Sequence, residues 1–130
     1  MNKYLFYLLF AFCTITANAQ SSPEGKKYVL LTDYACAKME GGGCSINTYK
    51  VFEFIKDKVF IYTLVKASCT SKEREENYNK DEPVKSTRYW TIKNNKIFVE
   101  KYDEYGKMEL NEDKIIAKKG KTVTEFLEQH

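Results

Sequence analysis

Apolar and polar residues alternate over short stretches along most of the chain, and this alternation is typical of β-strands that bury one face. The first stretch is KYVLLTDY at residues 27–34, and two more follow at 48–55 and 58–65. The last two flank a two-residue connection, Lys56-Asp57. Strand-like runs joined in this way predict a β-hairpin.

The alternation continues through the second half of the chain. Asn94-Asn95 lies between two of the later stretches, and asparagine tolerates the left-handed conformation that a tight turn needs. The final residues, 122–130, form either a closing strand or a short helix, and their first half favours a strand. The other stretches predicted as strands are 84–92, 96–102, 107–110 and 114–119.

Seven or eight short strands in consecutive hairpins predict an all-β fold, a small antiparallel meander that closes into a barrel. A sandwich of two sheets is the alternative. No part of the chain shows a convincing helical period, an internal repeat or a second domain. We therefore expect a single barrel domain over residues 20–130.

One segment, SKEREENYNKDEP at residues 71–83, interrupts the pattern because it is charged and has no apolar periodicity. It is predicted to be a solvated loop between two hairpins, with one helical turn. The alternative is a mobile lid or a partner-binding loop, since long loops in compact domains are often functional.

The first residues have the anatomy of a secretory signal peptide. Lys3 is followed by an apolar run at 5–15 and by a small-x-small cleavage sequence at 17–19. The apolar run is shorter than the ~20 residues that a spanning helix needs. We expect residues 1–19, Cys13 included, to be removed, and the mature protein to be periplasmic or secreted without a membrane span.

Three cysteines remain in the mature chain, and an oxidising compartment favours a disulfide between two of them. Proximity favours Cys36–Cys44, because the glycines at 41–43 let the chain turn back between them. Cys69 follows an apolar strand and is an alternative partner for either one. In every case one thiol is left over.

The residues present argue against several classes of chemistry. A net charge of +2 after removal of residues 1–19 is too mild for nucleic-acid binding. His130, at the C-terminus, is the only histidine, so nucleophile–base catalysis lacks its usual base and a zinc site lacks ligands. Carboxylates such as Glu100 and Glu104 have no distinctive spacing. We predict no enzymatic activity, no metal and no cofactor.

Glu53 is a separate question, because it stands between Phe52 and Phe54. Alternation favours both phenylalanines inside the barrel with Glu53 facing water. In the opposite arrangement Glu53 is a buried carboxylate that needs a partner, and Arg88 is the candidate.

Aromatic residues give the one positive signal for binding. Arg88, Tyr89 and Trp90 are adjacent, and these residue types are enriched where proteins bind their partners. We predict that they line a ligand-binding pocket. The alternative is that the rings fill the centre of a small barrel.

Residues 86–102, STRYWTIKNNKIFVEKY, resemble a hairpin of the small exported lipocalin-like proteins of Gram-negative bacteria, with Trp90, Ile92 and Ile97 at comparable places. The N-terminal G-x-W of classical lipocalins is absent, and Tyr28 is the nearest aromatic residue. A weaker likeness is to periplasmic lysozyme inhibitors, whose S-G-x-x-Y loop finds only the sequence STRY at 86–89.

The resemblance implies an exported, non-enzymatic binding protein for a small apolar or amphipathic molecule. The alternative is a protein-binding module that inhibits a cell-wall hydrolase or toxin, with an envelope protein as its partner, acting through residues 71–83 and Arg88.

Overall fold

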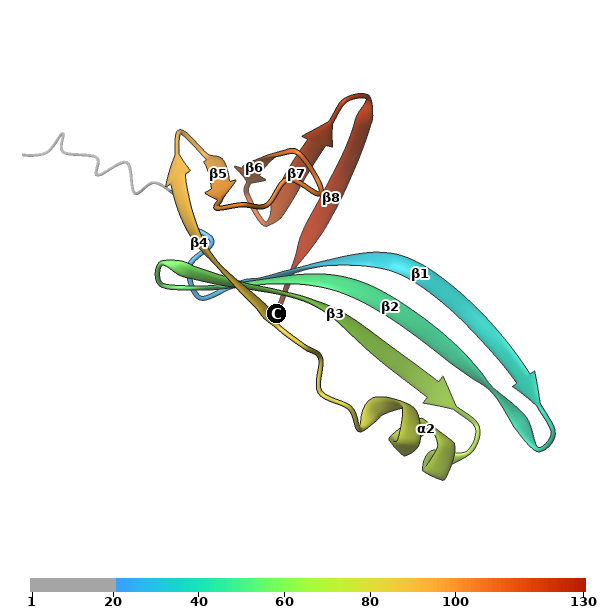
Figure 1. Ribbon diagram of the computed structural model, residues 1–130. Coiled ribbons are helices and arrows are strands. Elements are labelled where there is room, and N and C mark those ends of the chain that lie inside the picture. Colours follow the sequence, from blue (N-terminus) through green and yellow to red (C-terminus); the bar gives the residue numbers. More distant parts are fainter. Residues whose placement is uncertain (1–20) are drawn as a thin grey trace, which may run out of the picture.

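Each strand of the protein pairs with the next one in antiparallel fashion, and the last returns to the first to close a barrel (Figure 1). The computed structural model describes residues 21–130, so the expected signal peptide and Cys13 lie outside the described residues. The strands are β1 (Lys27–Met39), β2 (Gly42–Ile55), β3 (Lys58–Cys69), β4 (Ser86–Lys93), β5 (Lys96–Val99), β6 (Lys107–Asn111), β7 (Lys114–Lys119) and β8 (Thr122–Gln129). The all-β barrel predicted from the alternation is confirmed.

The first three strands are much longer than the others and continue past the barrel wall. β1 pairs with β8 only over residues 27–29, and β3 pairs with β4 only over residues 58–61. Residues 30–39, 42–50 and 63–69 therefore form a three-stranded extension, called the ribbon below, that sweeps away from the small strands (Figure 1).

A β-bulge lies where the ribbon leaves the barrel. The register of β1 against β2 shifts between Leu31 and Asp33, which leaves Thr32 as the extra residue. The Thr32 hydroxyl donates a hydrogen bond to the carbonyl oxygen of Thr48 at 3.0 Å. Such a bulge bends a strand and increases its twist, which accounts for the change of direction at this point.

The core of the barrel is aromatic. Phe52 is fully buried, and its ring meets those of Tyr102, Tyr105 and Phe126 at centroid distances of 5.6, 6.3 and 4.9 Å. Trp90 packs edge-on against Phe54 at 5.2 Å. The buried cluster consists of Tyr28, Phe52, Phe54, Val59, Ile61, Ile97, Met108, Leu110, Ile115, Ala117 and Phe126.

Glu53 lies on the outer face, as the alternation favours, since Phe52 and Phe54 are both buried. Its carboxylate accepts a hydrogen bond from the Tyr62 hydroxyl at 3.3 Å. Its ion pairs are with Lys27 and Lys85, at 3.9 and 3.6 Å, and not with Arg88.

The charged segment is more ordered than a loop with one helical turn. Within it, residues 72–79 form the helix α2 (Lys72–Asn79), and Ser71 caps its N-terminus. α2 has no buried residues, but it lies beside the free edge of β3 (Figure 1). The Asn79 amide donates to the carbonyl oxygen of Ala67 and accepts from its N–H, both at 2.9 Å. The helix thereby covers an edge that would otherwise expose unpaired backbone groups.

The disulfide joins Cys44 to Cys69, and the predicted Cys36–Cys44 pair is wrong. The two bonded cysteines are direct neighbours across β2 and β3, with their Cα atoms 4.1 Å apart. The β1–β2 hairpin turns after Met39, which places Cys36 opposite Ser45. Residues opposite each other share a face of a sheet and successive residues alternate, so Cys36 and Cys44 point to opposite faces. Cys36 is free and exposed.

Two tight turns have the glycine and asparagine conformations that the sequence indicates. Asn94 and Asn95 have φ angles of 51° and 62°, so the prediction of a left-handed turn between β4 and β5 is confirmed. Gly41 has φ 83° in the β1–β2 turn. Gly42 is needed for space as well, because a Cβ there would lie 2.6 Å from the Thr70 side chain.

Candidate functional site

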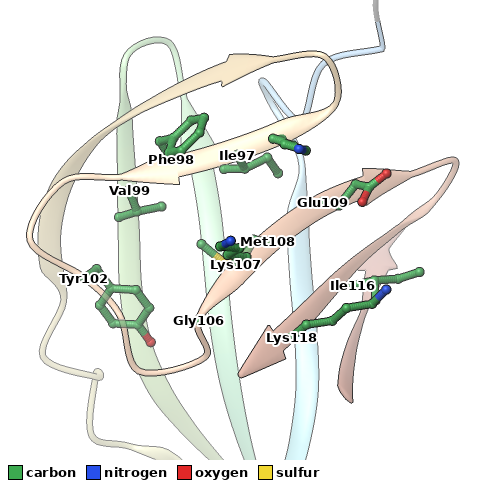
Figure 2. A pocket seen from close by; sticks show the side chains of 11 residues that line it. Ile97, Phe98, Val99, Tyr102, Gly106, Lys107, Met108, Glu109, Ile116 and Lys118 are labelled. Atoms are coloured by element: carbon green, nitrogen blue, oxygen red, sulfur yellow. The ribbon is translucent and has the colours of Figure 1, made fainter. Parts of the chain in front are cut away.

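The barrel wall is weakest between β5 and β6. These strands share only two residue pairs, Lys96 with Glu109 and Ile97 with Met108. Beyond these pairs the chain takes residues 100–106 to pass from one strand to the other, and the two strands part. A cavity of about 430 Å³, the β5–β6 cleft, occupies this place (Figure 2).

The floor of the cleft is part of the apolar core. Ile97 and Met108 are buried members of the core cluster, and the half-buried Val99 and Tyr102 pack against it. Ile116 is also half-buried but lies on the outer face of β7, since its neighbours Ile115 and Ala117 are buried. Figure 2 shows Phe98, Val99 and Tyr102 on one side of the cleft and Ile116 and Lys118 on the other. The residues that line it are Lys96, Ile97, Phe98, Val99, Tyr102, Gly106, Lys107, Met108, Glu109, Ile116 and Lys118.

The rim of the cleft is positively charged. Lys96, Lys107 and Lys118 line it, and Glu109 is the one acidic residue among the lining side chains. Within residues 21–130, none of the ion pairs involves any of these three lysines. An apolar floor with a few polar groups at its edge is the usual composition of a small-molecule site.

A polar network holds the loop at the end of the cleft. The Tyr102 hydroxyl donates to Glu104 Oε2 at 2.8 Å, and Lys50 Nζ lies 3.2 Å from the same oxygen. Lys119 Nζ donates to the Asp103 carbonyl at 3.2 Å. Gly106 completes the loop with φ 76°, and a Cβ at this position would collide with the carbonyl oxygen of Lys118.

This network sets the charge states of its members. Burial, and then the hydrogen bond to Glu104, raise the pKa of Tyr102, so its hydroxyl remains a donor. Partial burial acts to raise the pKa of Glu104 as well. Two effects together outweigh burial and lower the pKa of Glu104. They are the hydrogen bonds from Tyr102 and Lys50 and the positive charges of Lys50 and Lys119. Glu104 is therefore an anion at neutral pH and fixes the loop to β2.

Two of the three residues that the sequence singled out, Tyr89 and Trp90, lie next to the cleft rather than in it. Tyr89 is exposed, and Trp90 is half-buried against the core. Both line a smaller hollow of about 190 Å³ that shares Phe98 and Val99 with the cleft. Arg88 lines neither.

The residues of the cleft itself were missed by sequence reasoning. Residues 96–102 have a continuous strand pattern, but β5 ends at Val99. The available signal was the run DEYG at 103–106, whose turn-forming residues mark a connection too long for a tight hairpin.

Within residues 21–130, no helix combines the length and apolar character needed to cross a membrane. The same residues contain no group of three or more histidine, cysteine or acidic side chains placed to hold a metal ion. Comparison of the chain with known protein families, curated proteins and solved structures finds no match.

Proposed function

We propose that the protein is an exported, non-enzymatic binding protein that holds a small apolar or amphipathic molecule in the β5–β6 cleft. The observation that carries the proposal is a cavity of about 430 Å³ whose floor reaches the buried core side chains Ile97 and Met108. Ligand pockets of ~300–1,000 Å³ with mostly apolar linings are typical of small-molecule sites.

Export is part of the proposal. Residues 1–19 have the pattern of a secretory signal peptide, and the Cys44–Cys69 disulfide is the kind of bond that persists in an oxidising compartment. The resemblance of residues 86–102 to small exported lipocalin-like proteins supports the same class of function. The titratable side chains lining the cleft are lysines, Glu109 and Tyr102, which do not form a nucleophile–base pair.

A protein-binding role for residues 71–83 has less support. Asn79 and Glu75, the residues of α2 with specific hydrogen bonds to another element, bind the backbone of Ala67 and Cys69 in the same chain. These side chains are used to stabilise the ribbon, so they are not available to bind a partner protein.

A neutral hydrophobic dye, N-phenyl-1-naphthylamine, tests the proposal by fluorescence titration. Trp90, the single tryptophan, lies directly opposite Val99 of the cleft across β4 and β5, so its emission also reports an occupied cleft. We expect saturable dye binding and a change in Trp90 emission.

Two matched variants locate the dye. Ile116→Glu places a charge in the lining of the cleft and should weaken dye binding at least tenfold, about 1.4 kcal/mol. Val65→Glu places the same charge on an exposed position of the ribbon, on β3, and should leave binding unchanged. No dye binding by the wild-type protein, or equal binding by both variants, would contradict the proposal.

A further inference from the structure

If the cleft holds a ligand as proposed above, two lysines at its rim determine which head group that ligand carries. β6 and β7 are paired so that Lys107 stands directly opposite Lys118. On both strands the neighbouring residues Met108 and Ala117 are buried, so the two lysines share the outer face, at the rim of the cleft. Like charges directly opposite each other destabilise a sheet.

Within residues 21–130 neither lysine of this pair takes part in an ion pair, although Glu109 lies on the same face two residues from Lys107. Glu109, the acidic residue of the lining, is paired in register with Lys96 and with Ile116. Glu104 is engaged by Tyr102 and Lys50, and Lys119 donates hydrogen bonds to the backbone carbonyls of Asp103 and Glu104. The Lys107–Lys118 pair is therefore left as a local positive charge that an anion would relieve.

The apolar part of the cleft begins directly beside this charge. Ile116 is two residues from Lys118 on the same strand and therefore on the same face, and Met108 follows Lys107 into the floor. Figure 2 shows Lys107 beside Met108 in the middle of the view and Lys118 beside Ile116, on the side away from Phe98. A charged end and an apolar end thus lie next to each other in one cavity.

We infer that the ligand is a single-chain amphiphile with an anionic head group. Lys107 and Lys118 bind the head group, and Ile116, Met108 and Val99 contact the apolar chain. A charge-assisted contact from each ammonium group to an anion is stronger than a neutral hydrogen bond, and it also removes the repulsion between the two lysines.

Displacement of the bound dye by four molecules with the same alkyl chain tests the inference. The probes are decanoate, decyl phosphate, decanol and decyltrimethylammonium, each below its micelle concentration. We expect both anions to bind at least tenfold more tightly than decanol, and the cation to bind least well. A higher salt concentration should reduce the difference in affinity between the anions and decanol, since exposed charges are screened. The two anions distinguish a carboxylate from a phosphate head group.

Variants of the lysine pair locate the head group. Lys107→Gln and Lys118→Gln should each weaken decanoate binding about tenfold and leave decanol binding unchanged. Lys66→Gln, at an exposed position on the ribbon, is the matched control and should change neither. Lys118→Glu converts the repulsive pair into an attractive one. It should therefore raise the melting temperature of the unliganded protein while abolishing the preference for anions.

That combination of gained stability and lost binding cannot come from a misfolded variant. Equal binding of decanoate and decanol to the wild-type protein would overturn the inference and leave the proposed function standing. Failure of the dye and of all four probes to bind would overturn both. Lower stability of Lys118→Glu than of the wild-type protein would contradict the repulsion on which the inference depends.

Discussion

Phe52 connects several parts of the barrel interior through contacts between aromatic rings. It is fully buried and touches aromatic rings from β2, β8 and the loop that ends the cleft. Its contacts with Tyr102 and Phe126 are edge-to-face, and such contacts add to the free energy gained from burial alone. The same ring thus links the core to Tyr102, and through it to the polar network that holds residues 100–106.

Glu104 gives the protein a dependence on pH that can be tested. The pKa of Glu104 is below its ordinary value of 4.5 in the folded protein. Its contribution to stability is therefore present above pH 4.5 and is lost as the pH falls through the folded pKa. We expect the free energy of unfolding of Glu104→Gln to be lower than that of the wild-type protein at neutral pH.

The free energies of unfolding of the two proteins should converge as the pH falls below 4.5. Urea denaturation at several pH values across that range measures both free energies. Glu76→Gln, at an exposed position on α2, is the matched control. Its free energy of unfolding should differ from that of the wild-type protein by the same amount at every pH. A constant difference between wild type and Glu104→Gln at all pH values would show that the contribution of Glu104 does not depend on its charge.

The helix α2 stabilises the neighbouring strand through hydrogen bonds and not through burial. Asn79 satisfies both backbone groups of Ala67 on the β3 edge. Asn79→Ala should lower the free energy of unfolding by about 1–2 kcal/mol, at about 1 kcal/mol for each lost bond. It should also speed amide exchange at Ala67. Asn77→Ala, at an exposed position on the same helix, controls for helix propensity. Equal losses for both variants would contradict an edge-covering role.

The alternation of apolar and polar residues was enough to predict the hairpins and the barrel, because burying one face of a strand leaves its mark at every second residue. The length of α2 could not be predicted from periodicity, since this helix has no apolar face to leave a pattern. The disulfide was predicted with the wrong partner because β1 was expected to end at Tyr34. Its continuation to Met39 sets the faces of Cys36 and Cys44.

The cleft was beyond sequence reasoning for a different reason. It arises where two strands part, and a parting depends on the register of neighbouring strands rather than on the residues of either one. Arg88, Tyr89 and Trp90 were predicted to line a ligand-binding pocket. Tyr89 and Trp90 adjoin the cleft through Phe98 and Val99, whereas Arg88 lines neither hollow. The sequence pattern alone does not distinguish Lys107 and Lys118 from other surface lysines. The register of β6 and β7 does, because it places the two residues directly opposite each other.

The Cys44–Cys69 bond constrains the chain beyond its own two strands, because it joins residues with a sequence separation of 25. A loop of this size corresponds to about 3.5 kcal/mol of stabilisation through the unfolded chain. The double variant Cys44→Ala/Cys69→Ala should lose about this amount in urea denaturation. Cys36→Ala should stay within about 0.5 kcal/mol of the wild-type protein, because that side chain is exposed. Equal losses for the two variants would contradict the assigned pairing.

The ribbon keeps its free thiol on one face and its disulfide on the other. A thiol-reactive acceptor dye can therefore be attached at Cys36, because the sheet separates this thiol from the disulfide on the other face. The chain contains a single tryptophan, and Trp90 lies in the barrel wall beside the cleft. Trp90 and a label on Cys36 form a donor–acceptor pair across the bulge at Thr32. Energy transfer between them measures how far the ribbon bends relative to the barrel, with no further substitution in the described part of the chain.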